Sequence, residues 1–204
     1  NWHIKMVSDL SFLFGNRHIS GSIEGWNVSH VTNMAGMFGN CDPRDNETAD
    51  LRTKLLPNGE YAWDVSNVTN MAAMFDSVYN NFNPDISNWN VSNVTIMEEM
   101  FEGTQAFNGD ISSKLVTSIK MVDDNSDFEL DESYIAWNVA GVNNMKQMFT
   151  NAGAFNHDIS NWEVTLNEEN TLRMFHNANA MHNAHPVTAG SNYLSYFVGN
   201  NLND

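Results

Sequence analysis

The chain has 204 residues, 42% of them hydrophobic, which is enough for a packed core. Its 25 acidic residues outnumber 9 basic ones, and the formal charge of -16 would repel nucleic acids and anionic lipid surfaces. The single cysteine, Cys41, excludes an internal disulfide, and no apolar run reaches the roughly 18 residues of a membrane-spanning helix. We therefore expect a protein or glycan partner, no nucleic acid and no membrane-spanning segment.

A repeat of about 25 residues organises the chain. Residues 89–101 (WNVSNVTIMEEMF) have near copies beginning at Trp26, Trp63 and Trp137, and weaker copies begin at Trp2 and Trp162. The array continues to a degenerate last copy, and the repeat phenylalanines are Phe14, Phe38, Phe75, Phe101, Phe149, Phe175 and Phe197. We predict one repeat domain over residues 1–204, with insertions within 41–62 and 113–136. The first copy is truncated, which suggests a segment of a larger chain or assembly.

Each unit has a pattern that predicts its local structure. Trp89 and Val91 stand two apart, as on one side of a strand. A Val-Thr-Asn segment follows, with side chains that can cap a helix, and then Met34, Met37 and Phe38 fall at the spacing of a helical stripe. We predict an α/β, leucine-rich-repeat-like solenoid of about seven coils, each with one short strand and one short helix.

A second recurring sequence motif connects each unit to the next. Residues 82–89 (FNPDISNW) recur as 155–162 (FNHDISNW), and Asn and Asp at fixed places can satisfy backbone groups at tight bends. The complete repeat motif is F-N-x-D-I-S-x-W-N-V-S-N-V-T-x-M-x-x-M-F. It resembles the mycoplasma-type repeat of the BspA-like leucine-rich-repeat surface proteins. That resemblance covers nearly the whole chain outside the insertions. It implies a leucine-rich-repeat solenoid displayed at the cell surface, with adhesion or protein binding as its role.

The two insertions are where individual function is expected, because insertions in repeat proteins form loops on the array. In the first insertion, residues 55–61 (LLPNGEY) predict a hairpin. The second is acidic, and Asp123, Asp124 and Asp127 are candidate calcium ligands. Their spacing departs from that of an EF-hand loop, so a solvated acidic loop is the favoured interpretation.

Other reactive or modifiable groups give weaker signals. His176, His182 and His185 are close enough in sequence to suggest a metal site, although a surface or ladder role is favoured. Asn46 is the acceptor of the one glycosylation sequon that does not arise from the repeat motif. No nucleophile-and-base signature and no phosphate-binding glycine loop is present, so we predict no catalysis and no cofactor other than calcium.

These observations lead to two functional hypotheses. The first is a non-catalytic scaffold of an extracellular or cell-surface protein that mediates adhesion or protein-protein binding. The alternative is a structural subunit docked in a larger multi-protein assembly. In the first case we expect the partner on the exposed strand face, at the variable positions His30, Asn67, Asn93, Gly141 and Leu166. Aligned Ser and Thr pairs also suggest ice binding, but the later coils break that array.

Overall fold

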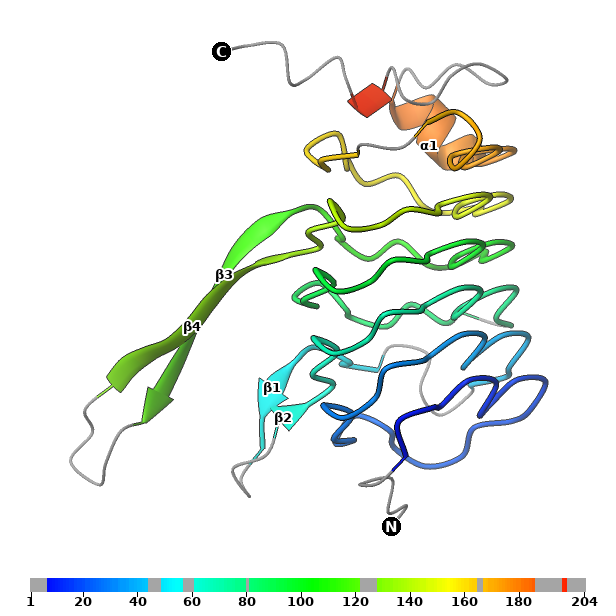
Figure 1. The fold of residues 1–204 in the computed structure, drawn as a ribbon. Coiled ribbons are helices and arrows are strands. Elements are labelled where there is room, and N and C mark those ends of the chain that lie inside the picture. Colours follow the sequence, from blue (N-terminus) through cyan, green and yellow to red (C-terminus); the bar gives the residue numbers. More distant parts are fainter. Residues whose placement is uncertain are drawn as a thin grey trace, which may run out of the picture.

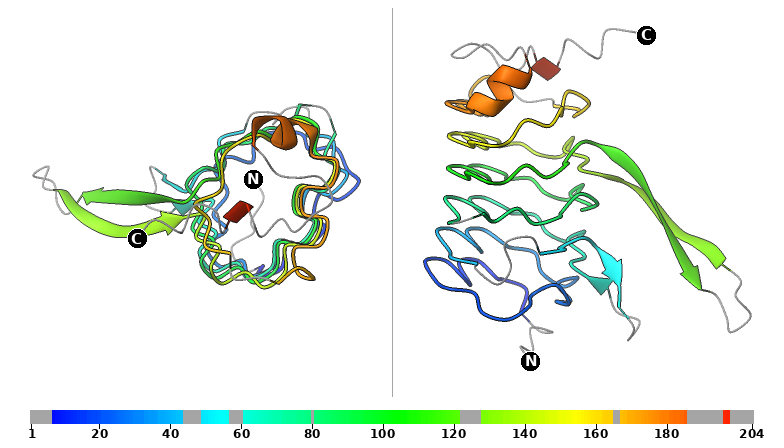
Figure 2. Two further views of the ribbon diagram at one scale, coloured as in Figure 1. Left: turned by 90° about the horizontal axis from the view of Figure 1, so that it is seen from above. Right: turned by 180° about the vertical axis from the view of Figure 1, so that it is seen from behind.

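The repeats lie one above another as a stack of coils. The computed structural model describes residues 7–43, 49–56, 61–79, 81–121, 128–164, 167–185 and 196–197. Successive coils follow one another along the axis from blue to orange (Figure 1), and seen from above they superimpose on a single ring (Figure 2). Parallel bridges join equivalent residues of neighbouring coils, as Asn33 to Asn70 and Asn70 to Ile96. The repeat therefore sets the architecture.

The regular secondary structure lies outside the repeat units. Strands β1 (Lys54–Leu55) and β2 (Tyr61–Ala62) form one antiparallel hairpin. Strands β3 (Lys114–Met121) and β4 (Phe128–Ala136) form a longer one, with an irregularity in register between Thr117 and Ile119. Helix α1 (Asn179–Ala184) follows the last described coil. The predicted α/β, leucine-rich-repeat-like solenoid is wrong, because the described coils contain turns and isolated bridges in place of a strand and a helix.

Left-handed backbone angles explain why the predicted helix does not form. From Phe14 to Phe175, the residue two before each repeat phenylalanine has a positive φ, as at Gly36 (59°), Ala73 (52°) and Glu99 (58°). The residue two after that phenylalanine has one as well, for example Asn40 (53°) and Ser77 (50°). A right-handed helix cannot contain a left-handed residue at every fourth position. The segment therefore folds as consecutive tight turns.

Backbone hydrogen bonds run both within and between coils. Met34 and Phe38 donate their N–H groups to carbonyls of the next coil, those of Asn70 and Met74, each at 2.9 Å. Between them, Met37 donates to the carbonyl of Met34 in its own coil and closes a turn. The segment that follows each repeat tryptophan forms the other side of the coil, which we call the tryptophan side. There the N–H groups donate to the preceding coil instead, and Thr69 donates to the carbonyl of Thr32 at 2.9 Å. Every second amide of the turn segment thus ties two coils together.

Short polar side chains hold the bends. The Asn33 and Asn70 side-chain oxygens accept the backbone N–H groups two residues ahead, at 3.1 and 3.0 Å. The Asp85 carboxylate does the same for Ser87 at 3.0 Å. These are Asx turns, in which a side chain replaces a backbone acceptor. The expected helix-capping residues do bind backbone amides, but they cap turns.

Aromatic columns fill the axis of the stack. Trp63, Trp89, Trp137 and Trp162 stack with ring centroids 6.1, 6.4 and 6.1 Å apart, and all four are fully buried. The repeat phenylalanines form a second column, with centroids about 5.5 Å apart in Phe75–Phe101 and Phe101–Phe149. Each indole N–H of the tryptophan column also donates to a carbonyl of the preceding coil. The core is thus continuous from coil to coil.

A substitution at one of the left-handed positions tests the turn structure. Glu99 has a φ of 58°, and burial together with Glu98 and Asp76 raises its pKa. Glu99→Gly is expected to raise the free energy of unfolding by about 1 kcal/mol, because glycine adopts this conformation without steric cost. A raised folded pKa means that ionised Glu99 is less favourable in the folded state. The gain should therefore be larger at pH 7 than at pH 4, as measured by urea unfolding.

The matched control is the equivalent residue of an earlier coil, where glycine already occurs. A Cβ added at Gly36 would overlap with the Phe12 ring, and the φ there is 59°. Gly36→Ala is expected to cost about 1 kcal/mol or more. Destabilisation of the protein by Glu99→Gly would contradict the turn structure, because a helical residue at that place would lose stability on conversion to glycine.

Candidate binding surfaces

The residues predicted for a strand face lie in one column of turns. His30, Asn67, Asn93 and Gly141 occupy equivalent places in successive coils; the last three are exposed, and His30 is half-buried. The amide of Asn67 donates to the carbonyl of Ser29, and that of Asn93 to the carbonyl of Ser66, each at 2.7 Å. Both side-chain amides therefore already form hydrogen bonds between coils. The fifth predicted position, Leu166, lies outside the described residues. A binding role for this column stays a prediction.

The predicted calcium and glycan positions fall outside the described residues. This holds for Asp123, Asp124 and Asp127 in the second insertion and for Asn46 in the first. Within the part of the chain that the structure describes, no three His, Cys, Asp or Glu side chains are grouped to hold a metal ion. Calcium binding and glycosylation therefore stay predictions.

Cys41 and His185 have structural surroundings. The Cys41 thiol is fully buried, and burial beside Asp42 raises its pKa to about 12, which disfavours the nucleophilic thiolate. His185 contacts the carbonyl of Asn156 through Nε2 at 2.8 Å. These contacts give the two residues a structural role at their places in the stack.

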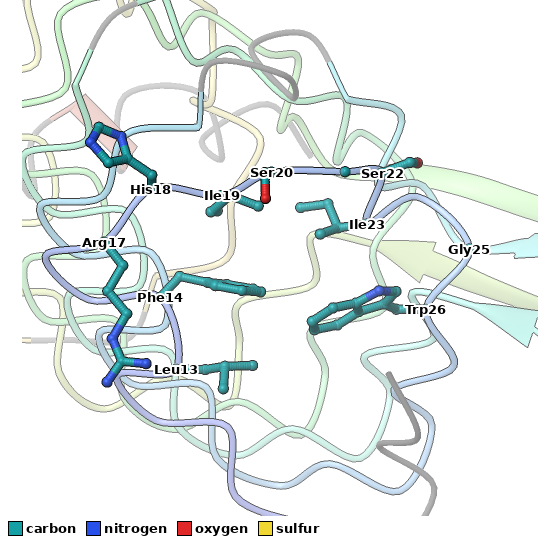
Figure 3. A pocket seen from close by; sticks show the side chains of 11 residues that line it. Leu13, Phe14, Arg17, His18, Ile19, Ser20, Ser22, Ile23, Gly25 and Trp26 are labelled. Carbon is teal, nitrogen blue, oxygen red and sulfur yellow. The ribbon is translucent and has the colours of Figure 1, made fainter. Parts of the chain in front are cut away.

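A pocket of about 780 Å³ opens in the first described coils (Figure 3). Leu13, Phe14, Ile23 and Trp26 surround the hollow, while Arg17 extends outward at its edge. Coils further along the stack fill the corresponding space with a second phenylalanine, such as Phe107 and Phe155, which stack on the repeat phenylalanines with centroids 4.3 and 4.4 Å apart. Residues 15–25 contain no phenylalanine. The pocket therefore lies where later coils carry this second phenylalanine.

The β3–β4 hairpin projects from the side of the stack as a twisted ribbon (Figures 1 and 2). Val116 and Tyr134, which pair in register, pack against the core. The neighbouring pair, Leu115 and Ile135, lies on the other face of the ribbon, and these side chains are 69% and 50% exposed. Successive side chains of a strand point to opposite faces, so at these two pairs one face of the ribbon packs against the core and the other is exposed.

Polar contacts fix the base of this ribbon. The Tyr134 hydroxyl donates to the carbonyl of Asn88 at 2.6 Å, and burial near Asp64 raises the pKa of Tyr134 to about 12. Lys114 pairs with Asp110 at 3.0 Å. These bonds join the ribbon to more than one coil. The exposed face is consequently held in a defined orientation.

The β1–β2 hairpin projects from the same side of the stack (Figures 1 and 2). Its Leu55 is 53% exposed. We call the two hairpins together, with Leu55, Leu115 and Ile135, the hairpin flank. The first hairpin confirms the sequence prediction. The second was missed there, although the runs Lys114–Met121 and Phe128–Ala136 contain the β-branched residues and the alternation that favour strands.

The geometry defines a repeat protein built from stacked, turn-rich coils with projecting hairpins. The family described as "Mycoplasma protein of unknown function, DUF285" matches residues 1–54, 51–131 and 115–189. The chain belongs to this repeat family. The match confirms a mycoplasma-type repeat but does not specify the BspA-like leucine-rich-repeat proteins. No curated protein and no solved structure matches the chain.

No helix among the described residues has both the length and the hydrophobicity to cross a bilayer.

Proposed function

We propose that this chain is a non-catalytic scaffold that binds another protein through its hairpin flank. The observation that carries the proposal is the exposed apolar pair Leu115–Ile135 on a ribbon whose opposite face is anchored to the core. Paired apolar side chains that face solvent on a projecting element are typical of interaction sites. A ribbon already held in place also loses little conformational entropy when a partner binds.

We further propose display at the cell surface, with adhesion or protein-protein binding as the role. Two observations support display at the surface. The repeat motif resembles that of BspA-like surface proteins, and the chain belongs to a mycoplasma repeat family. A direct test is to treat intact source cells with a protease that cannot enter them. Loss of the chain from intact cells supports surface display, whereas cleavage only after lysis opposes it.

The binding role predicts a specific effect of two substitutions on the ribbon. Leu115→Ser combined with Ile135→Ser is expected to weaken partner binding by about tenfold or more, because central apolar contacts dominate interface energies. The tagged wild-type chain and the variant would be cross-linked in source-cell extract, and each captured protein quantified by mass spectrometry. The partner is the protein whose recovery falls with the variant.

Leu172→Ser supplies the matched control. Leu172 is 56% exposed, but it lies in the turn segment before the repeat phenylalanine Phe175 and not on the hairpin flank. That variant should retain the partner in full, and all three proteins should unfold at the same urea concentration. If every captured protein is recovered equally with the wild-type chain and the ribbon variant, the hairpin flank is not the binding surface.

The pocket favours a second candidate function, that of a structural subunit docked in a larger assembly. Apolar side chains, among them Phe14 and Trp26, line it beside polar ones such as Arg17, and a hollow of this mixed character can receive an element of another protein. Ser20 is exposed and lines the pocket, so Ser20→Cys can carry a photo-cross-linker there. Cross-linking to one defined neighbour in native extract supports this role, and the absence of any cross-linked neighbour opposes it.

A further inference from the structure

We infer that the pocket in the first described coils receives a phenylalanine side chain of another protein, in the place where later coils seat a phenylalanine of their own. This inference rests on the second candidate function, that of a docked subunit, and adds the chemistry of the docking element. It follows from the register of the repeat and from the packing of the pocket wall.

The register of the repeat places Ile19 where later coils carry their second phenylalanine. That phenylalanine stands four residues before the isoleucine of its return segment, as Phe155 stands before Ile159. The same count back from Ile23 leads to Ile19, and both isoleucines line the pocket. The first coil thus has an aliphatic side chain at a position where later coils place an aromatic ring.

The later coils show how a ring packs at this position. Phe107 stacks on Phe101 with ring centroids 4.3 Å and planes 10° apart, and Phe155 stacks on Phe149 at 4.4 Å and 12°. Phe107 and Phe155 are both buried. In the first coil the corresponding repeat phenylalanine is Phe14, whose ring borders the hollow (Figure 3). A ring that enters from another protein can stack on Phe14 in the same way.

Bonds to the next coil hold the wall of the pocket in place. Ile19 donates its backbone N–H to the carbonyl of Asp42 at 3.0 Å, and Asp42 donates its own to the carbonyl of Arg17 at 2.8 Å. The His18 ring also pairs with the Asp42 carboxylate at 2.9 Å. The wall is therefore ordered before anything binds. Because little further ordering is needed, a single aromatic side chain can contribute measurable affinity.

The polar edge of the pocket favours a protein segment as the occupant. Arg17, Ser20 and Ser22 line the pocket and are exposed, and their side chains can donate hydrogen bonds to backbone carbonyls on either side of an inserted phenylalanine. The volume of about 780 Å³ also leaves room for those flanking residues. A wholly apolar ligand such as a lipid chain would leave these polar groups without partners.

The test uses a short blocked peptide with one phenylalanine between glycine and serine residues, titrated into the full chain labelled with nitrogen-15. The amides of Gly21 and Gly25, two glycines that line the pocket, report binding through their chemical shifts. We expect saturable shifts with a Kd on the order of 1 mM. A matched peptide with leucine should bind about threefold or more weakly, because it cannot stack on Phe14.

Two blocked forms of the protein show whether the peptide occupies the pocket. Ile19→Phe supplies the ring from the chain itself, and Ser20→Cys can be modified with a bulky maleimide after folding, so that folding is unaffected. Each should weaken binding of the phenylalanine peptide about tenfold or more, whereas Leu172→Ser should leave it unchanged. Unchanged binding to the blocked forms overturns the inference. Equal binding of the two peptides, or no binding to the wild-type chain, overturns it as well.

A second copy of the chain is the alternative occupant, because its Phe12 is 67% exposed. Analytical ultracentrifugation of the wild-type chain, Phe12→Ser and Ile19→Phe separates the two cases. A dimer that both substitutions abolish would place Phe12 in the pocket and overturn the inference, whereas a monomeric wild-type chain supports a different protein as the partner. If cross-linking at Ser20→Cys captures one neighbour while the phenylalanine peptide fails to bind, the docked-subunit role stands and only the chemistry of the docking element is wrong.

Discussion

Trp89→Ala is expected to lower the free energy of unfolding by about 3 to 5 kcal/mol, the usual cost of removing a fully buried large aromatic side chain. The Trp89 ring stacks between Trp63 and Trp137, at centroid distances of 6.1 and 6.4 Å. Its indole N–H donates to the carbonyl of Leu51 at 2.6 Å, and that buried acceptor would lose its partner. Urea unfolding followed by circular dichroism measures the loss.

Trp26→Ala is the control for this prediction, because Trp26 occupies the equivalent repeat position but is half-buried beside the pocket. Its replacement should cost clearly less than that of Trp89, since less apolar surface is exposed to water. Equal costs at the two positions would show that the tryptophans do not form the buried column described above. Unfolding in two separate transitions would show that the stack is not one cooperative unit.

Labelling of Cys41 is expected to be at least about a thousandfold slower in the folded protein than in urea at pH 8. Burial moves the thiol pKa from an ordinary value near 9 to about 12, so the reactive thiolate becomes about a thousandfold scarcer. The fully buried sulfur is also shielded from reagent. The rate of alkylation by iodoacetamide, followed by mass spectrometry, measures this effect.

Ser20→Cys provides an internal reference, because Ser20 is exposed. In that variant one thiol should react at once and the other only after unfolding. Fast alkylation of the wild-type folded chain would place Cys41 at the surface and contradict the packing of its coil.

The raised pKa of Cys41 also links folding to pH. Below about pH 9 the thiol is protonated in both states, and its contribution to stability is constant. Above that pH the unfolded chain loses the proton while the folded chain keeps it until about pH 12. The free energy of unfolding should therefore fall as pH rises from 9 to 12. Unfolding curves of the wild-type chain across that range measure the decline.

The sequence predicted which residues form the core but not the backbone path that buries them. Trp89 and Phe101 recur at fixed spacing, and both are fully buried as their periodicity indicates. Met34, Met37 and Phe38 fit a helical stripe, yet turns bury the same three side chains. Short apolar spacings do not distinguish these two structures, because the decisive bonds go to another coil.

The left-handed residues explain why this error was hard to avoid. Glycine marks the required conformation at Gly36 and Gly103, but Ala73, Glu99 and Gln147 adopt it without any signal in the sequence. Neighbouring coils impose the angle through hydrogen bonds that exist only once the stack has formed. Local propensity was overruled by tertiary structure at these positions.

The candidate binding surfaces were predicted unevenly. The column of His30, Asn67, Asn93 and Gly141 is aligned, because equivalent repeat positions must stack. The amides of Asn67 and Asn93, however, bind the backbone of the coil before them. The exposed pair Leu115–Ile135 was overlooked because the acidic residues of the second insertion favoured a solvated loop over paired strands.

The opposed directions of hydrogen bonding on the two sides of the coil have an electrostatic consequence. On the turn side the amides of Met34 and Phe38 point toward the next coil, whereas on the tryptophan side that of Thr69 points back. Peptide dipoles aligned in one direction would add along the axis, as they do in a helix. Here the bonds on the tryptophan side offset part of that sum, so each added coil contributes less axial dipole than it would if all of its bonds pointed the same way.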